Sequence, residues 1–146
     1  MSNLSENRKA LHDYTILETF EAGIVLSGQE VKSAKAGQVS LLGSFVKIKN
    51  NEAYLTNAYI APYKKSPANP AYVPEQDRKL LLTRKELDEI ATRRNAEGLA
   101  LVPLSIFTTR NLVKVKIGLA RGKRKYEKRE TIKKREVDKD IRRFTN

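Results

Sequence analysis

The chain changes character near its C-terminal end, and this change limits how much of it can build a folded core. Residues 121–146 carry 12 Lys or Arg and 5 Asp or Glu, whereas residues 1–120 carry 17 and 12. The last 26 residues therefore hold +7 of the net charge of +12. A charge-dense block beside a nearly balanced domain is typical of an interaction tail. We predict a folded domain over residues 1–122 and a basic tail over residues 123–146.

Upstream of the tail, apolar residues alternate with polar ones in short segments, which predicts strands. The expected strands span residues 13–26, 44–49, 52–59, 99–107 and 112–117. Gly23 predicts a bulge or bend, and Pro103 predicts an edge strand because it cannot donate to a ladder. Hairpin-linked short strands with a bent first strand favour an OB-like antiparallel β-barrel, in a chain that is mainly β with short helices.

Capping boxes and turn residues predict the connections. Ser27 with Glu30, and Thr83 with Glu86, each predict a helix start, because such pairs satisfy each other's backbone N–H groups. The two helices are expected to end at Gly37 and Gly98, and residues 7–12 to form a helical turn. The residues expected on the buried helix faces are Val31, Ala34, Leu87, Ile90 and Ala91. The expected tight turns are Asn50-Asn51 and Arg110-Asn111, and the four prolines of residues 62–77 predict a long loop.

Composition narrows the function. The chain has no cysteine and one histidine, which argues against disulfides, thiol chemistry and structural zinc. It shows no phosphate-binding glycine loop or dinucleotide fingerprint, so we expect no cofactor and no small-molecule substrate. Residues 99–107 are too short an apolar stretch to span a bilayer, and no signal region is apparent, so we expect a cytoplasmic monomer. A sequence pI of about 10.0 favours a polyanionic partner.

Four lysines are candidates for phosphate contacts. Lys32 and Lys35 are three residues apart in the first predicted helix, so we expect them to point the same way. Lys114 and Lys116 alternate with buried residues of the last predicted strand. A solvated lysine face is the competing interpretation, and the net charge favours an RNA-binding patch.

His12-Asp13 is the pair to consider for catalysis. We expect adjacent residues to point to opposite sides of a strand, and no Ser or Cys nucleophile lies in a recognisable motif. His12 is therefore interpreted as an RNA-facing or structural residue. An RNA-processing enzyme that uses His12 is kept as an alternative.

The tail carries one aromatic residue inside its basic run. Tyr126 can stack on a base while neighbouring cations hold phosphates. Farther on, a sparse helical stripe is too small to fold alone; it consists of Ile132, Val137, Ile141 and Phe144. We predict a tail that becomes ordered on RNA, and a disordered solubilising tail is the alternative.

Several motifs between residues 7 and 135 form a recognisable set. They are Asn7-Arg8-Lys9-Ala10, His12-Asp13-Tyr14, Glu18-Thr19-Phe20-Glu21-Ala22-Gly23-Ile24, Gly28-Gln29-Glu30-Val31-Lys32-Ser33, Gly43-Ser44-Phe45, Tyr59-Ile60-Ala61-Pro62-Tyr63, Arg78-Lys79-Leu80-Leu81-Leu82, Val102-Pro103-Leu104 and Gly118-Leu119-Ala120-Arg121-Gly122-Lys123. In this order they resemble the SsrA-binding protein family, also called small protein B.

The resemblance implies an OB-like barrel that binds the tRNA-like domain of transfer-messenger RNA. It implies delivery of this RNA to stalled ribosomes for rescue and peptide tagging, in trans-translation. It also implies a tail that is disordered when free and helical when bound to small-subunit rRNA at the decoding centre and mRNA channel. Recognition of transfer-messenger RNA is carried over to His12, Glu21, Lys35, Leu81, Lys114 and Gly122. The ribosomal role is carried over to the tail segment Lys123, Arg124, Lys125, Tyr126, Glu127, Lys128 and Arg129.

Two positions depart from the family pattern. Thr83 stands where members often have Asn or His, so no RNA contact is carried over to it. Tyr126-Glu127 stands where some members have His-Asp, which keeps stacking and charge but changes the reach of the carboxylate. The remaining alternative within RNA binding is another OB-fold ribosome-associated rRNA-binding protein.

Overall fold

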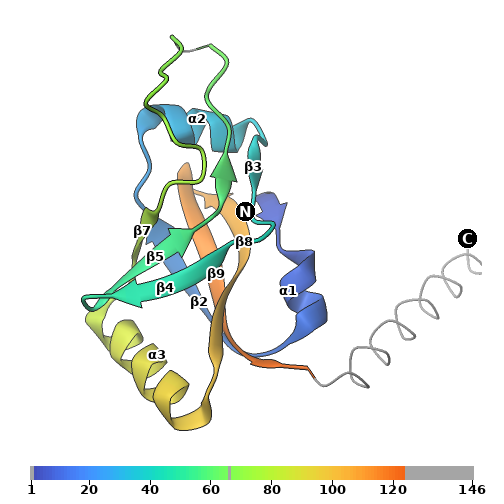
Figure 1. Cartoon of the computed structure of the whole chain (residues 1–146), viewed down its shortest axis with the longest axis vertical. Helices are drawn as coiled ribbons and strands as arrows, with labels where there is room; N and C mark the ends of the chain where they lie inside the picture. The colour runs from blue at the N-terminus through green and yellow to red at the C-terminus, as the bar shows by residue number, and fades with distance from the viewer. Residues whose placement is uncertain (1, 66, 124–146) are drawn as a thin grey trace, which may run out of the picture.

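The computed structural model describes residues 2–65 and 67–123 of the chain. Strands dominate these two described ranges, and the three helices within them lie at the periphery (Figure 1). The helices are α1 (Arg8–Asp13), α2 (Gly28–Lys35) and α3 (Arg84–Glu97). The strands are β1 (Ser2–Glu6), β2 (Tyr14–Ile24), β3 (Val39–Ser40), β4 (Phe45–Lys49), β5 (Glu52–Thr56), β6 (Tyr59–Ile60), β7 (Arg78–Leu81), β8 (Ala100–Thr109) and β9 (Leu112–Gly122).

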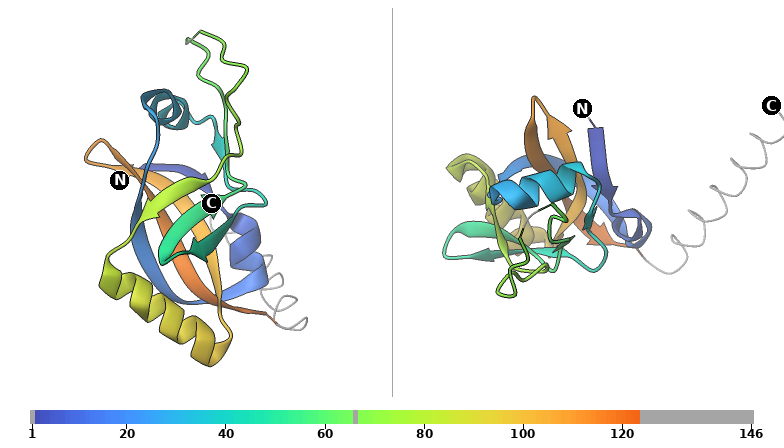
Figure 2. Two further views of the ribbon diagram at one scale, coloured as in Figure 1. Left: turned by 60° about the vertical axis from the view of Figure 1, so that its left-hand side comes forward. Right: turned by 90° about the horizontal axis from the view of Figure 1, so that it is seen from above.

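Seven strands form one antiparallel sheet in the order β1-β8-β9-β2-β7-β5-β4, and β3 pairs with β6. β4 also contacts β8, so the sheet curls around the core (Figure 2). The helix α2 and the loop of residues 61–77 lie at one end, and α3 lies at the other (Figure 1). The predicted fold class, a mainly β antiparallel barrel with short helices, is confirmed.

Two clusters of apolar side chains hold the elements together. The main cluster fills the barrel and includes Phe20, Leu55 and Ile117. A smaller one lies between α1 and the outer side of the sheet, where Ala10 packs near Leu104. Helix α1 therefore covers one part of the outer sheet surface and leaves the part nearer α2 open.

Local signals in the sequence placed the turns and helix starts correctly. Both capping boxes are present, and α3 ends at Gly98 with a φ of 65°. The hairpin residues Asn50 and Asn51 have φ values of 54° and 60°, and Arg110 and Asn111 have 49° and 64°. Within the predicted helix faces, Ala34 and Ile90 are buried and Ala91 is exposed, so Ala91 was assigned wrongly.

Two predictions about the strands are wrong, and the strands β1, β3 and β7 were not predicted. β1 was not foreseen, because its polar sequence shows no alternation, yet it pairs with β8. β8 is consequently not an edge strand, because β1 pairs with its residues Ser105 to Thr108. This pairing stops before it reaches Pro103, and the β8–β9 register shifts next to the proline. The irregularity of β2 lies at Leu17, between Ile16 and Glu18, and not at Gly23.

Candidate nucleic-acid interface

The outer face of β7, β2 and β9 brings four of the predicted site residues together. Glu21 is the register partner of Lys116, and Gly23 is the partner of both Lys114 and Leu81. Leu81 is 53% exposed. A Cβ atom at Gly23 would lie 3.3 Å from the Leu81 Cβ, so the glycine lets Leu81 pack closely over β2. Gly23 therefore serves close approach here, and not the bulge expected from the sequence.

The charges on this face have no ion-pair partner within the described residues. No ion pair joins Glu21 to Lys116, although they are register partners, and Lys114 forms none either. By contrast, Lys79 on β7 is paired with Glu52 at 3.0 Å. The face thus presents two ammonium groups, one carboxylate and one exposed apolar side chain to a ligand.

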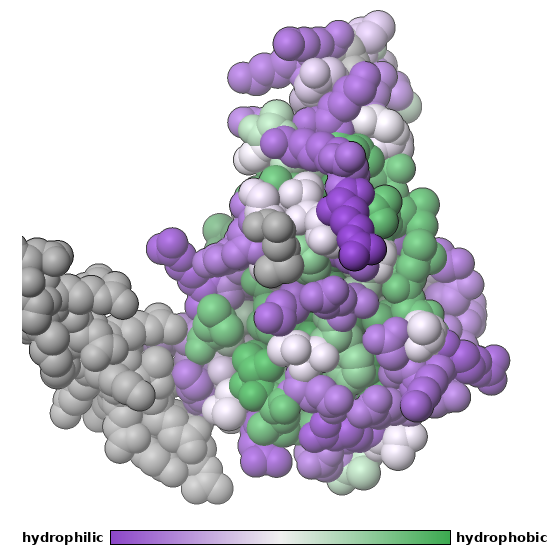
Figure 3. Space-filling model, turned by 180° about the vertical axis from the view of Figure 1, so that it is seen from behind, coloured by the Kyte–Doolittle hydropathy of each residue, from purple (hydrophilic) through white to green (hydrophobic). Residues whose placement is uncertain are grey.

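A hollow of about 360 Å³ adjoins this face. Glu21 and Lys116 line it together with apolar side chains from α1, β2 and β8, among them Leu11, Ile16 and Leu104. The surface seen from behind shows apolar patches bordered by hydrophilic side chains (Figure 3). Asn3 of β1 also lines the hollow. Sequence reasoning missed this residue, because nothing in the polar segment Ser2–Glu6 indicated a strand beside β8.

The two lysines of α2 do not act as a pair. Lys35 Nζ donates to the Asn111 carbonyl at 3.1 Å, which places it at the β8–β9 turn. Lys32 Nζ instead lies 5.8 Å from the centroid of the Tyr63 ring, toward the loop of residues 61–77. The expectation that both point the same way is wrong, because each side chain follows its own partner. Only Lys35 lies near the β9 lysines.

His12 and Gly122 lie at the other end of the sheet, where β9 ends. Gly122 is the register partner of Tyr14, and Lys123 donates its backbone N–H to the Asp13 carbonyl at 2.9 Å. A Cβ atom at Gly122 would meet no described atom within 4 Å. Neither the packing of the described residues nor a positive φ requires glycine at this position.

His12 and Asp13 interact, contrary to the sequence expectation. The His12 Nδ1 lies 3.0 Å from the Asp13 Oδ1. Both residues belong to α1 and not to a strand, which is why adjacent side chains can meet. Among the described residues no group of three or more His, Cys, Asp or Glu could hold a metal ion. Within the described residues, the pair is therefore not part of a metal-binding group.

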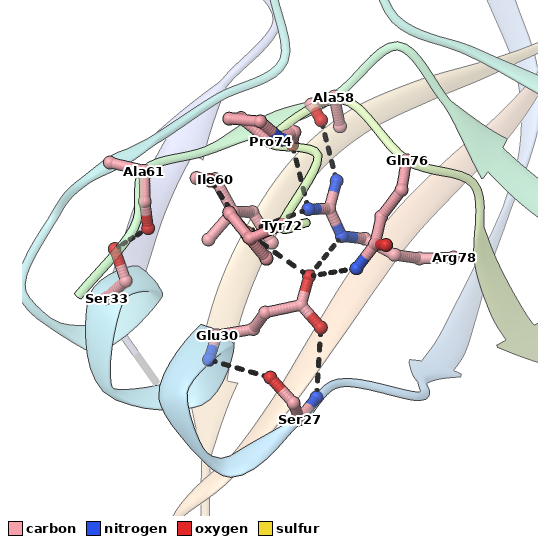
Figure 4. Close-up of polar contacts among 10 residues, drawn as sticks. All are labelled: Ser27, Glu30, Ser33, Ala58, Ile60, Ala61, Tyr72, Pro74, Gln76 and Arg78. Atoms are coloured by element: carbon pink, nitrogen blue, oxygen red, sulfur yellow. Dashed lines mark hydrogen bonds and ion pairs between the residues drawn. The ribbon is translucent and has the colours of Figure 1, made fainter. Parts of the chain in front are cut away.

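A buried ion pair fixes the loop of residues 61–77 beside α2 (Figure 4). The Arg78 Nε donates to the Glu30 Oε2 at 2.8 Å, and both side chains are at most 5% exposed. Arg78 also donates to the carbonyls of Ala58 at 2.7 Å and Pro74 at 2.8 Å. Of the two adjacent basic residues, Arg78 is buried and Lys79 is exposed.

The environment of Glu30 favours its ionised form. Burial alone raises the pKa of the Glu30 carboxyl, but hydrogen bonds from the Ser27 backbone, Arg78 and Gln76 outweigh burial and lower it. Tyr72 completes the contacts by donating to the Ile60 carbonyl at 2.8 Å. This network gives an irregular loop a fixed position without a helix or strand of its own.

The tail residues Arg124, Lys125, Tyr126, Glu127, Lys128 and Arg129 lie outside the described residues, so their predicted role stays a prediction. Lys123 is described, and its Nζ donates to the Leu11 carbonyl at 3.1 Å. The tail therefore starts beside α1 and His12. No helix in the described ranges is long and apolar enough to cross a membrane.

Comparisons with known proteins agree on one family. A family model described as "SmpB protein" matches residues 4–146. The chain is 48% identical to an SsrA-binding protein of Coprothermobacter proteolyticus, over 98% of this chain and 96% of that one. It is 49% identical to SsrA-binding proteins of Roseiflexus sp. strain RS-1 and Streptococcus equi subsp. zooepidemicus, over 96% of this chain and 89% and 90% of theirs.

A solved structure reported as "tmRNA-SmpB: a journey to the center of the bacterial ribosome" matches with a TM-score of 0.66. It shares 50% sequence identity and covers 87% of this chain and 92% of its own. The matched proteins are nearly the same length as this one, and the likeness spans both the barrel and the sequence that follows it. The chain belongs to the SmpB family of SsrA-binding proteins.

Proposed function

We propose that this chain is an RNA-binding adaptor for transfer-messenger RNA. It binds the tRNA-like domain of that RNA and delivers it to stalled ribosomes for rescue and peptide tagging. The observation that carries this proposal is the open face of Glu21, Leu81, Lys114 and Lys116, in a chain of the SmpB family. A cytoplasmic location and a monomeric state fit this role.

The chemistry of the face supports each assignment. Lys114 and Lys116 neutralise phosphates, which contributes affinity without sequence preference. Glu21 repels phosphate and accepts hydrogen bonds from base amino groups, so it contributes to base recognition and does not bind the RNA backbone. Leu81, more than half exposed, packs on a base face or a sugar. These roles need no metal and no cofactor.

A second contact with the same RNA lies where β9 ends. His12 and Gly122 flank the start of the tail, and Lys123 is held against α1. The tail segment from Lys123 to Arg129 then enters the decoding centre and the mRNA channel of the small subunit. In this arrangement the barrel holds one RNA and the tail engages another.

Replacing Lys114 and Lys116 with glutamine should weaken binding of the tRNA-like-domain RNA by about tenfold or more. Each lost phosphate contact lowers the slope of log affinity against log salt by about 0.7–0.9. Fluorescence anisotropy at several salt concentrations measures both quantities. The matched control replaces Lys49 of β4 and Arg94 of α3 with glutamine, which removes the same charge from positions outside the β7–β2–β9 face. Equal losses in both variants would show that only overall charge matters.

We expect no RNA cleavage by this protein, although His12 and Asp13 are in contact. The pair lacks a nucleophile motif and, among the described residues, a metal cluster. The pure protein incubated with RNA and Mg²⁺ should give the same product pattern as the His12→Ala variant. Cleavage that disappears with His12→Ala would restore the enzyme alternative.

The RNA recovered with the protein tests the proposal directly. Sequencing the RNA that co-purifies from cytoplasm should identify one structured, tRNA-like species. Enrichment of bulk rRNA alone would favour a ribosome-associated rRNA-binding protein instead.

A further inference from the structure

The turn of the β8–β9 hairpin lies on the side of the molecule that carries α2 (Figure 2). A second hollow adjoins this turn. It measures about 500 Å³, larger than the hollow beside Glu21. Its lining combines Lys35 of α2, Arg110 of the turn, Ser2 of β1 and the two threonines Thr108 and Thr109. Of these, only Lys35 belongs to the RNA-binding residues that the family resemblance implies.

The backbone around this hollow is held by specific contacts. Arg110 and Asn111 adopt φ values of 49° and 64°, which form the tight turn. Lys35 Nζ donates to the Asn111 carbonyl at 3.1 Å, so α2 and the hairpin are tied together. An ammonium group has three donors, and this bond uses one of them. Lys35 can therefore hold the turn and still donate to a ligand.

The electrostatics of the hollow favour an anion. Within the part of the chain that the structure describes, neither Lys35 nor Arg110 forms an ion pair, and no carboxylate lines the hollow. The arginines Arg78 and Arg93 are, by contrast, both engaged by glutamates. A guanidinium group matches the geometry of phosphate oxygens and stays charged at any physiological pH. Threonine hydroxyls beside it can donate further hydrogen bonds.

The hollow also continues the proposed RNA face. Arg110 lies in the turn that joins β8 to β9, and Lys114 is the third residue of β9. Lys116, Lys114 and Arg110 therefore extend from the open sheet face toward the turn. We propose that this hollow holds a phosphate of the RNA backbone, with Arg110 as the phosphate-binding residue beside Lys35. This inference rests on the proposed function, because the phosphate belongs to the RNA held on the β2–β9 face.

The Arg110→Asn variant tests the assignment without disturbing the turn, because asparagine tolerates a positive φ better than most residues. We expect it to bind the tRNA-like-domain RNA about 5- to 10-fold more weakly, with the salt slope reduced by about 0.7–0.9. Arg110→Lys keeps a point charge and should recover part of the affinity. Arg94→Gln, in the last turns of α3, removes the same charge elsewhere and should stay within twofold of the wild type.

A cross-linking measurement gives an independent readout. The chain has no cysteine, so Arg110→Cys and Arg94→Cys can each carry a single photo-cross-linker. RNA should be captured from position 110 and not from position 94. Unchanged affinity and salt slope in Arg110→Asn, or equal capture from both positions, would overturn the proposed phosphate site. If the wild-type protein itself fails to bind this RNA, the proposed function fails instead.

Discussion

Replacing Arg78 with methionine is expected to lower the free energy of unfolding by about 3–5 kcal/mol, because it leaves the buried Glu30 carboxylate without its counter-ion. The carbonyls of Ala58 and Pro74 also lose their donor. A loss of this size is a large part of the total stability of a small domain, about 5–15 kcal/mol. Urea unfolding followed by circular dichroism measures the change.

The neighbouring residue provides the control. Lys79 lies on the same strand as Arg78 and forms an ion pair with Glu52 of β5. Solvent screens that pair, so Lys79→Met should lower the free energy of unfolding far less. Replacing both Glu30 and Arg78 with methionine should recover much of the stability, because an apolar pair leaves no unpaired charge. Equal losses in Arg78→Met and Lys79→Met would show that burial adds nothing to the ion pair.

The same ion pair affects how the free energy of unfolding depends on pH in the acid range. The pKa of the folded-state Glu30 carboxyl lies below its ordinary value of 4.5. Its contribution is therefore fully present above that pH and is lost as the pH falls through the folded-state pKa. Arg78→Met removes a hydrogen bond and a charge that lower this pKa, so stability should depend less on pH below 4.5.

The parts of the fold that the sequence predicted well are those in which neighbouring residues determine the backbone. Asn50-Asn51 and Arg110-Asn111 form turns because asparagine accepts a positive φ. Ser27 and Thr83 start helices because their partners lie three residues away. The alternation of Val113, Val115 and Ile117 likewise identified the buried face of β9.

Long-range pairing explains what the sequence did not predict. β1 is a strand only because β8 lies beside it, and about one hundred residues separate the two. Its presence turns β8 into an inner strand, which Pro103 tolerates at a register shift. Arg78 is buried only because Glu30, from another element, neutralises it. None of these contacts leaves a periodic pattern in the local sequence.

The candidate site shows the same division. Lys114 and Lys116 were identified from strand alternation, and Glu21 and Leu81 from the family resemblance. Their meeting on one face depends on the β7–β2–β9 register, which the sequence does not reveal. Lys32 was grouped with Lys35 by helix spacing, yet Tyr63 lies beside one and Asn111 beside the other. Residue spacing predicts the helix face from which a lysine side chain projects, but it does not predict which partner that long side chain contacts.

Replacing Glu127, Lys128 and Arg129 with alanine should abolish peptide tagging on stalled ribosomes while leaving the affinity for the tRNA-like-domain RNA within about threefold. The reason is spatial. The proposed contacts with that RNA come from the β7–β2–β9 face and from His12 and Gly122, whereas the three substituted residues follow Lys123 in the tail. The lost cations contribute only non-specific attraction to that RNA, which salt screens. A reconstituted translation assay on an mRNA without a stop codon measures tagging.

The barrel-face variant with Lys114 and Lys116 replaced by glutamine is the matched comparison, because it also removes two cations. Its primary defect should be weaker RNA binding. Its tagging should therefore recover when the RNA concentration is raised above its new Kd, because added RNA restores occupancy by mass action. Tagging by the tail variant should not recover, because its defect follows RNA binding. If the tail variant lost RNA affinity as severely as the barrel-face variant, one continuous RNA surface would replace the two-part arrangement.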